Sequence, residues 1–264
     1  MPDPSPRSRI DTHHHLWDLA IRDQPWIDPV QMAAIRRRFG LGDLDAAVAG
    51  CDIAATVLVQ VLNRADETDE LLDAARTSSL IAGVIGWADL ERRDLPEQIE
   101  RLRSRGPIVG IRHQLQAEPA PTVWLQRVDV DAGLRHLGEA GLVFDLMLRP
   151  EQFEAAVEVV RAHPGLMFVI DHLGKPPIES RLLEPWASGL RRLAHEPNVA
   201  CKLSGLVTVA DRDTWAIDDL RPYVDVALEA FRPARLLFGS DWPCACWRPT
   251  TPPSSARSTR SSPT

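Results

Sequence analysis

The sequence predicts an α/β protein, specifically a (β/α)8 TIM barrel. Eight short, apolar, β-rich runs alternate with stretches of helical period, which is the pattern of a parallel sheet built from βα units. The chain has 264 residues, close to the roughly 250 that one such barrel occupies. An open, doubly wound sheet is the alternative, but no G-x-G-x-x-G turn supports it.

The predicted strands are rich in valine, isoleucine and leucine, and polar or turn-forming residues bound them. They span residues 9–15, 55–61, 81–88, 109–115, 143–148, 167–171, 200–204 and 236–240.

The predicted helices lie between these strands. The helix expected over 150–162 shows the signals well, because Pro150 opens it and Glu151 and Glu154 lie in its first turn. Its apolar residues then recur at helical spacing. The full set of predicted helices is 67–76, 96–103, 124–140, 150–162, 182–194 and 218–231.

Composition and charge exclude several classes of protein. No apolar run reaches the roughly 20 residues that cross a bilayer, and residues 1–9 lack the apolar stretch of a secretion signal. The net charge of -7 argues against nucleic acid as a partner. Four scattered cysteines without zinc-type spacing fit a reducing compartment. We therefore expect a cytoplasmic protein that acts on a small molecule, without a membrane partner.

The motif D-x-H-x-H, formed by Asp11, His13 and His15, lies on the first predicted strand. Alternate residues of a strand share one face, so His13 and His15 point together while His14 points away. Two imidazoles on one face make half of a metal or acid–base site. A run of three histidines is also compatible with an accidental cluster, so the motif needs support from the rest of the chain.

Polar side chains follow the other predicted strands, where a TIM barrel places its catalytic residues. For Asp145 and Asp171 we favour a role in turns or caps, and for Ser204 a role in a turn. His172, Lys202 and Asp241 follow apolar strands, where a buried group without a partner would be costly, and they are stronger site candidates. The remaining strand-end candidates are Gln60, Arg112, His113 and Ser240.

Five segments together resemble the amidohydrolase superfamily, in particular the amidohydrolase-2 branch that contains sugar lactonases and 2-pyrone-4,6-dicarboxylate hydrolase. They occur in the order typical of that branch, between about Arg9 and Pro243. The segments are 10–18 (Ile-Asp-Thr-His-His-His-Leu-Trp-Asp), 110–115 (Gly-Ile-Arg-His-Gln-Leu), 169–176 (Val-Ile-Asp-His-Leu-Gly-Lys-Pro), 201–206 (Cys-Lys-Leu-Ser-Gly-Leu) and 238–243 (Phe-Gly-Ser-Asp-Trp-Pro).

The resemblance implies a divalent metal held by His13, His15 and Asp241. Relatives that bind metal strongly often add a histidine from the fifth strand or a lysine from the fourth. Here the fifth strand offers Asp145, and the fourth offers Arg112 and a histidine. The full ligand set is therefore missing, which implies a weakly bound metal such as zinc, or none.

The resemblance also implies hydrolysis of a small sugar lactone, an aldonolactone such as fuconolactone. In this hypothesis Asp241 takes a proton from the attacking water, and His172 with the strand 1 histidines stabilises the oxyanion. Arg112 and Lys202 would orient the substrate. Further predicted substrate contacts are His113, Gln60 and Trp17.

Two alternatives stay open at this point. One is a metal-dependent amidohydrolase or decarboxylase on the same barrel. The other is an inactive, truncated family member. Barrels of this kind often form homo-oligomers, but no segment indicates an interface.

The inactive alternative arises from the end of the chain. Residues 247–264 contain four Pro, five Ser, four Thr and three Arg without apolar period, which predicts disorder where a barrel needs a helix after its eighth strand. A one-nucleotide shift near the Pro243 codon would place apolar residues at a helical spacing there. We interpret 247–264 as a frameshifted tail, 9–246 as the barrel, and 1–8 as a disordered leader.

Overall fold

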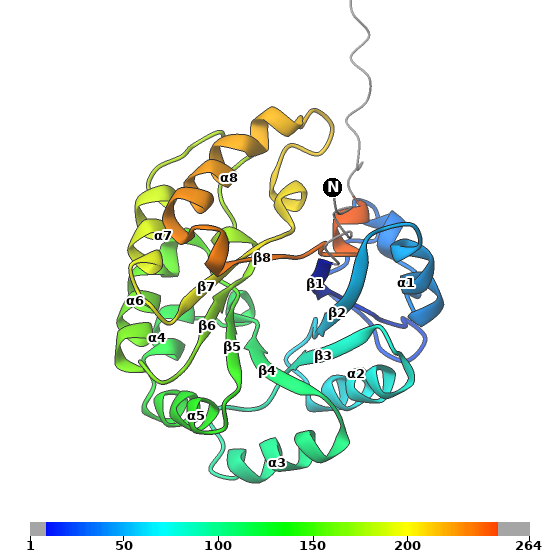
Figure 1. Cartoon of the computed structure of the whole chain (residues 1–264), viewed down its shortest axis with the longest axis vertical. Helices are drawn as coiled ribbons and strands as arrows, with labels where there is room; N and C mark the ends of the chain where they lie inside the picture. The colour runs from blue at the N-terminus through cyan, green and yellow to red at the C-terminus, as the bar shows by residue number, and fades with distance from the viewer. Residues whose placement is uncertain (1–8, 248–264) are drawn as a thin grey trace, which may run out of the picture.

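The computed structural model describes residues 9–247 as a barrel of eight parallel strands surrounded by helices (Figure 1). Each strand pairs with the next one along the chain, in the order β1 to β8. The predicted fold class and all eight predicted strands are confirmed. The strands are β1 Arg9–His14, β2 Ile53–Val59, β3 Ile81–Gly86, β4 Ile108–His113, β5 Val143–Leu146, β6 Phe168–Ile170, β7 Val199–Leu203 and β8 Leu236–Phe238.

The helices follow the predicted order with two corrections. Helix α1 was not predicted, because only Leu44 of its eight residues is buried and no apolar stripe develops. The predicted helix over 124–140 is two helices, because Arg127 has an extended backbone between them. The helices are α1 Leu41–Val48, α2 Ala65–Thr77, α3 Leu95–Arg105, α4 Pro121–Leu125, α5 Val128–Glu139, α6 Phe153–Ala162, α7 Trp186–Ala194 and α8 Ile217–Phe231.

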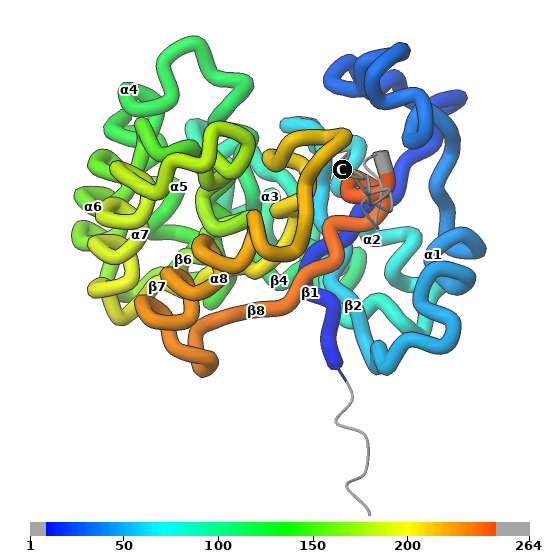
Figure 2. Tube along the Cα trace, turned by 90° about the horizontal axis from the view of Figure 1, so that it is seen from above, coloured from blue at the N-terminus to red at the C-terminus, as the bar shows by residue number. Residues whose placement is uncertain are grey.

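The barrel closes where the first and last strands meet. Figure 2 shows β1 and β8 side by side although they come from opposite ends of the described chain. The Asp11 carboxylate accepts hydrogen bonds from the backbone N–H of Ser240 at 2.8 Å and from its hydroxyl at 2.5 Å. The amide of Asp241 in turn donates to the carbonyl of His13 at 2.8 Å. The buried Asp11 therefore fixes the segment that carries Asp241.

The strand period decides which side chains face the barrel interior. Arg112 of β4 and Asp145 of β5 are register partners, so their side chains share one face of the sheet. Asp145 contacts Lys202 of β7, which is not its neighbouring strand, so this face is the barrel interior. Their apolar neighbours, such as Phe144 and Cys201, lie fully buried on the opposite, helix-facing side. One layer of the barrel interior is consequently charged rather than apolar.

Two predictions concern residues near the ends of the chain. The leader, 1–8, and the tail, from 248 onward, lie outside the described residues, and so does any helix after β8 beyond the short 3-10 turn Cys244–Trp247. Within residues 9–247, no helix combines the length and apolarity needed to span a membrane.

Replacing Asp11 with alanine should loosen the barrel closure. The change leaves the Ser240 N–H and hydroxyl without their acceptor, so we expect the free energy of unfolding to fall by about 2 kcal/mol or more. Urea unfolding measures this loss. Thr12→Val is the matched control, because it removes only one exposed hydrogen bond between the same strands, to the Phe238 carbonyl. Equal stabilities for the Asp11 and Thr12 variants would contradict the role of Asp11.

Candidate functional site

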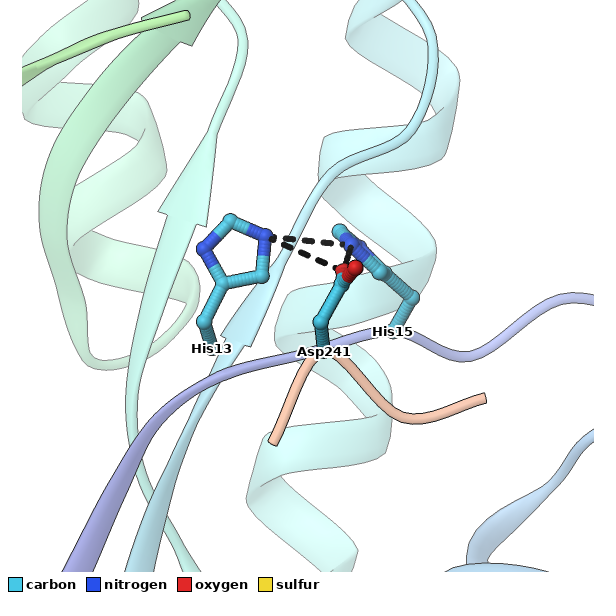
Figure 3. A group of neighbouring side chains, drawn as sticks. All are labelled: His13, His15 and Asp241. Carbon is cyan, nitrogen blue, oxygen red and sulfur yellow. Dashed lines mark hydrogen bonds and ion pairs between the residues drawn. The ribbon is translucent and has the colours of Figure 1, made fainter. Parts of the chain in front are cut away.

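Three side chains meet at the carboxyl end of the barrel (Figure 3). His13 and His15 come from β1 and the residue after it, and Asp241 comes from the turn after β8. The two Nε2 atoms are 3.1 Å apart, and the Asp241 Oδ1 atom lies 3.4 Å from His15 Nε2 and 3.8 Å from His13 Nε2. All three side chains are buried. The ring of His14 points away, toward Thr56 of β2, as predicted.

The spacing of these atoms fits a metal ion. A tetrahedral zinc with ligands at about 2.1 Å separates those ligands by about 3.4 Å. The Nδ1 atom of His15 lies 2.7 Å from the Val59 carbonyl, so it carries the hydrogen and leaves the Nε2 lone pair free. His13 Nδ1 lies 3.3 Å from Asp171 Oδ1, and donation there frees its Nε2 in the same way. The donor set His13, His15 and Asp241 can therefore hold a cation.

His172 completes the floor of the site. Its Nδ1 is 2.8 Å from the Ser204 hydroxyl, and its Nε2 is 4.0 Å from Asp241 Oδ1. Burial lowers the pKa of His172 to about 4, so its ring is neutral at pH 7. Burial alone would raise the pKa of Asp241, but His172 and His15 bring it below its ordinary value. The site thus pairs an ionised carboxylate with a neutral imidazole.

Below this floor lies a buried network of four charges. The Lys202 ammonium contacts Asp145, and it lies 3.0 Å from Asp171 Oδ1. The Arg112 guanidinium donates to the other oxygen of Asp171 at 2.9 Å and to the backbone carbonyl of Gln60. Lys202 and Asp171 both reach His13 Nδ1, at 3.2 and 3.3 Å. Instead of serving turns or caps, Asp145 and Asp171 neutralise two cations and position a histidine of the site.

A cavity of about 990 Å³ opens above the floor. Among the predicted site residues, His15, Arg112, His172 and Asp241 line it. Sequence reasoning missed other lining residues, which come from loops between strands and helices. These include Asn63, Gln114, Gln116, Arg149, Glu151 and Lys175.

The other predicted substrate contacts lie outside the lining of this cavity. His113 stacks on Trp124 with ring centroids 3.9 Å apart and accepts a hydrogen bond from the Trp87 indole at 3.2 Å. Gln60 donates to the Arg112 carbonyl at 2.8 Å. Trp17 packs edge-on against Phe39 in a small apolar cluster. Contact of these three residues with the substrate stays a prediction, and so does contact of Lys202.

Residues 10–254 match the family model described as amidohydrolase. This chain belongs to the amidohydrolase family. It is 39% identical over 235 residues to an L-fucono-1,5-lactonase of Burkholderia ambifaria, covering 89% of this chain and 80% of that protein. An L-fucono-1,5-lactonase of Burkholderia multivorans is 36% identical over 244 residues, covering 89% and 82%. The family predicted from the motifs is confirmed.

A solved relative matches the three-dimensional structure as well. A crystal structure of an amidohydrolase from Burkholderia multivorans with bound zinc superposes with a TM-score of 0.87 at 35% identity. The match covers 92% of this chain and 87% of that one.

Replacing Gly205 with alanine should damage the site of this amidohydrolase more than its fold. Gly205 has a φ of 62°, and an added Cβ would lie 2.6 Å from His172 Nδ1 and 2.7 Å from Asp241 Oδ2. We expect at least a tenfold loss of turnover, since small displacements of reacting groups are costly. Steady-state kinetics measures it. Gly141→Ala is the control, because Gly141 has a φ of 66° and open space around it. If both variants keep full activity, the close approach at Gly205 is irrelevant to catalysis.

Replacing Lys202 with methionine should destabilise the protein, because Asp145 and Asp171 would lose a buried cation. Removing one partner of a buried ion pair costs about 3 to 5 kcal/mol. Thermal and urea unfolding measure the effect. The double variant Lys202→Met with Asp145→Asn removes the unpaired charge and should recover part of the loss. Additive effects of the two substitutions would show that they do not act through this pair.

Proposed function

We propose that this amidohydrolase is a lactonase that opens a small sugar lactone, an aldonolactone such as L-fucono-1,5-lactone, to its hydroxy acid. The observation that carries the proposal is the ionised Asp241 at the floor of a large cavity, in contact with His15 and close to His172. The names of the two Burkholderia relatives agree with this chemistry. A cavity of about 990 Å³ has room for a single sugar ring.

The residues divide the reaction between them. Asp241 takes a proton from a water molecule as the water oxygen attacks the lactone carbonyl carbon. When the Ser204 hydroxyl donates to His172 Nδ1, the Nε2 atom of His172 carries a hydrogen that faces the cavity. That N–H is placed to stabilise the oxyanion that forms on the carbonyl oxygen. A lactone is an activated ester, so a general base and a hydrogen-bond donor can be sufficient for its hydrolysis.

His13, His15 and Asp241 would hold a divalent cation such as zinc, which supplies Lewis-acid polarisation of a carbonyl oxygen when bound. Two features of the site agree with weak binding of this cation. The Arg112 Nη1 atom lies 3.4 Å from His13 Nε2 and brings a positive charge close to the cation position. Asp145 of the fifth strand pairs with Lys202 rather than adding a ligand.

The cavity charges favour a neutral or singly charged substrate. Arg112 is paired with Asp171, so it offers less net charge to a ligand than the sequence alone indicates. Glu151 adds a carboxylate to the cavity wall. Asp241 is a second cavity carboxylate, so the two offset the cavity cations Arg149 and Lys175 and leave no excess of positive charge to bind a dicarboxylate.

Hydrolysis of a panel of aldonolactones and of a pyrone dicarboxylate, followed by proton release, tests the function. We expect turnover of a sugar lactone, and a fall in kcat of at least about 100-fold in Asp241→Asn, because general base catalysis contributes that much. Glu179→Gln removes another cavity carboxylate and should retain most of the wild-type rate. Near-normal turnover by Asp241→Asn would exclude Asp241 as the base.

The same assay after chelation distinguishes the alternatives. Turnover that survives chelation supports catalysis by Asp241 and His172 alone. Activity that is abolished by chelation and restored by zinc favours a metal-dependent hydrolase. A folded protein that hydrolyses no lactone in the panel would refute the proposed function.

A further inference from the structure

Arg112 of β4, Lys175 after β6 and Lys202 of β7 are cations at the carboxyl ends of their strands, and they differ in the carboxylates that they contact. Lys202 contacts Asp145 and Asp171, and Arg112 contacts Asp171. Lys175 lines the cavity, half-buried, and within residues 9–247 no carboxylate lies in ion-pair contact with it. Among these described residues, its Nζ atom donates one hydrogen bond, to Gln116 Oε1 at 2.9 Å. An ammonium group has three hydrogens, so two remain available to a ligand.

The backbone that delivers Lys175 to the cavity is strained. His172, Leu173 and Lys175 have φ values of 53°, 52° and 52°, and Gly174 lies between them at 66°. A left-handed conformation costs about 1 to 3 kcal/mol for a residue with a side chain, and such costs gather at functional sites. The segment is held by the Trp186 indole, which donates to the Leu173 carbonyl at 2.7 Å. This turn brings His172 and Lys175 to the same cavity.

We propose that Lys175 is a catalytic residue of the lactonase, the acid that protonates the leaving ring oxygen when the lactone opens. The inference rests on the proposed function and adds to it the residue that protonates the leaving group. Gln116, which lines the same cavity, positions the ammonium group through its hydrogen bond.

The reaction then balances in atoms and charge. The water oxygen forms a bond to the carbonyl carbon, and its proton passes to Asp241. The bond from that carbon to the ring oxygen breaks, and the ring oxygen takes a proton from Lys175 to become a hydroxyl. Asp241 releases its proton, Lys175 takes one up, and the hydroxy acid leaves as a carboxylate. The net change is one water consumed and one proton released.

The electrostatic surroundings agree with this role. Burial and the nearby Arg149 lower the pKa of Lys175 to about 8, while Asp241 and Asp171 act in the opposite direction. Lys175 also contributes to the lowered pKa of His172, which places its charge close to the floor of the site. An acid whose pKa lies near neutrality transfers its proton most effectively at that pH.

Two variants and two substrates test the proposal. Arginine keeps the charge of Lys175 but does not give up a proton in proteins, whereas methionine removes the charge. On an aldonolactone, whose leaving group is an alkoxide, both Lys175→Arg and Lys175→Met should lose about 100-fold or more in kcat. On 3,4-dihydrocoumarin, whose leaving group is a stable phenolate, the loss should stay below tenfold. Thermal unfolding of each variant checks that it is folded.

Three results would overturn the role of Lys175 as the acid and show that it only binds substrate. They are a near-wild-type kcat in Lys175→Arg, a loss confined to KM, and equal losses on both substrates. If the wild type accepts the aldonolactone alone, the kcat of the arginine variant decides. Arg149→Met removes another cavity cation and should lose less than Lys175→Met. A folded wild type inactive on all lactones refutes the proposed function itself.

Discussion

The network of Lys202, Asp145, Asp171 and Arg112 is the constraint on which the site depends. It joins β4, β5, β7 and the turn after β6 inside the barrel, where these charges have little solvent to stabilise them. Each charge therefore requires its partners, and the strands that carry them are held in one arrangement. His13 lies against both Lys202 and Asp171, so the network also sets its orientation. The reaction in the cavity therefore takes place beside a network of charges whose positions are already set by the fold.

Much of this could be predicted from the sequence, because apolar runs and strand period are local signals. They located the eight strands and placed His13, His15, His172 and Asp241 at one end of the barrel. The roles of Lys202 and Asp171 could not be predicted in the same way. Whether a strand-end cation faces the cavity or a buried carboxylate depends on which strand lies opposite. The short α1, with one buried residue, carries too weak a period to be recognised.

Lys175 escaped prediction for a different reason. It lies five residues beyond the end of β6, where an ordinary loop would carry it away from the barrel. Only the left-handed turn from His172 to Lys175 returns it to the cavity. Leucine and lysine rarely adopt that conformation, so local propensity does not predict a run of left-handed residues here. Gly174 fits because an added Cβ would lie 2.4 Å from the Phe153 ring.

The closure of the barrel through Asp11 and Ser240 has a consequence for folding. These residues are 229 positions apart, so their contact has one of the largest loop-closure costs in the chain. Contacts of such long range slow folding, and a chain that emerges from the ribosome amino end first cannot form this one until β8 is made. His13 and Asp241 come together at the same junction. Hydrolytic activity would thus report completed closure, and a nascent chain would stay inert until then.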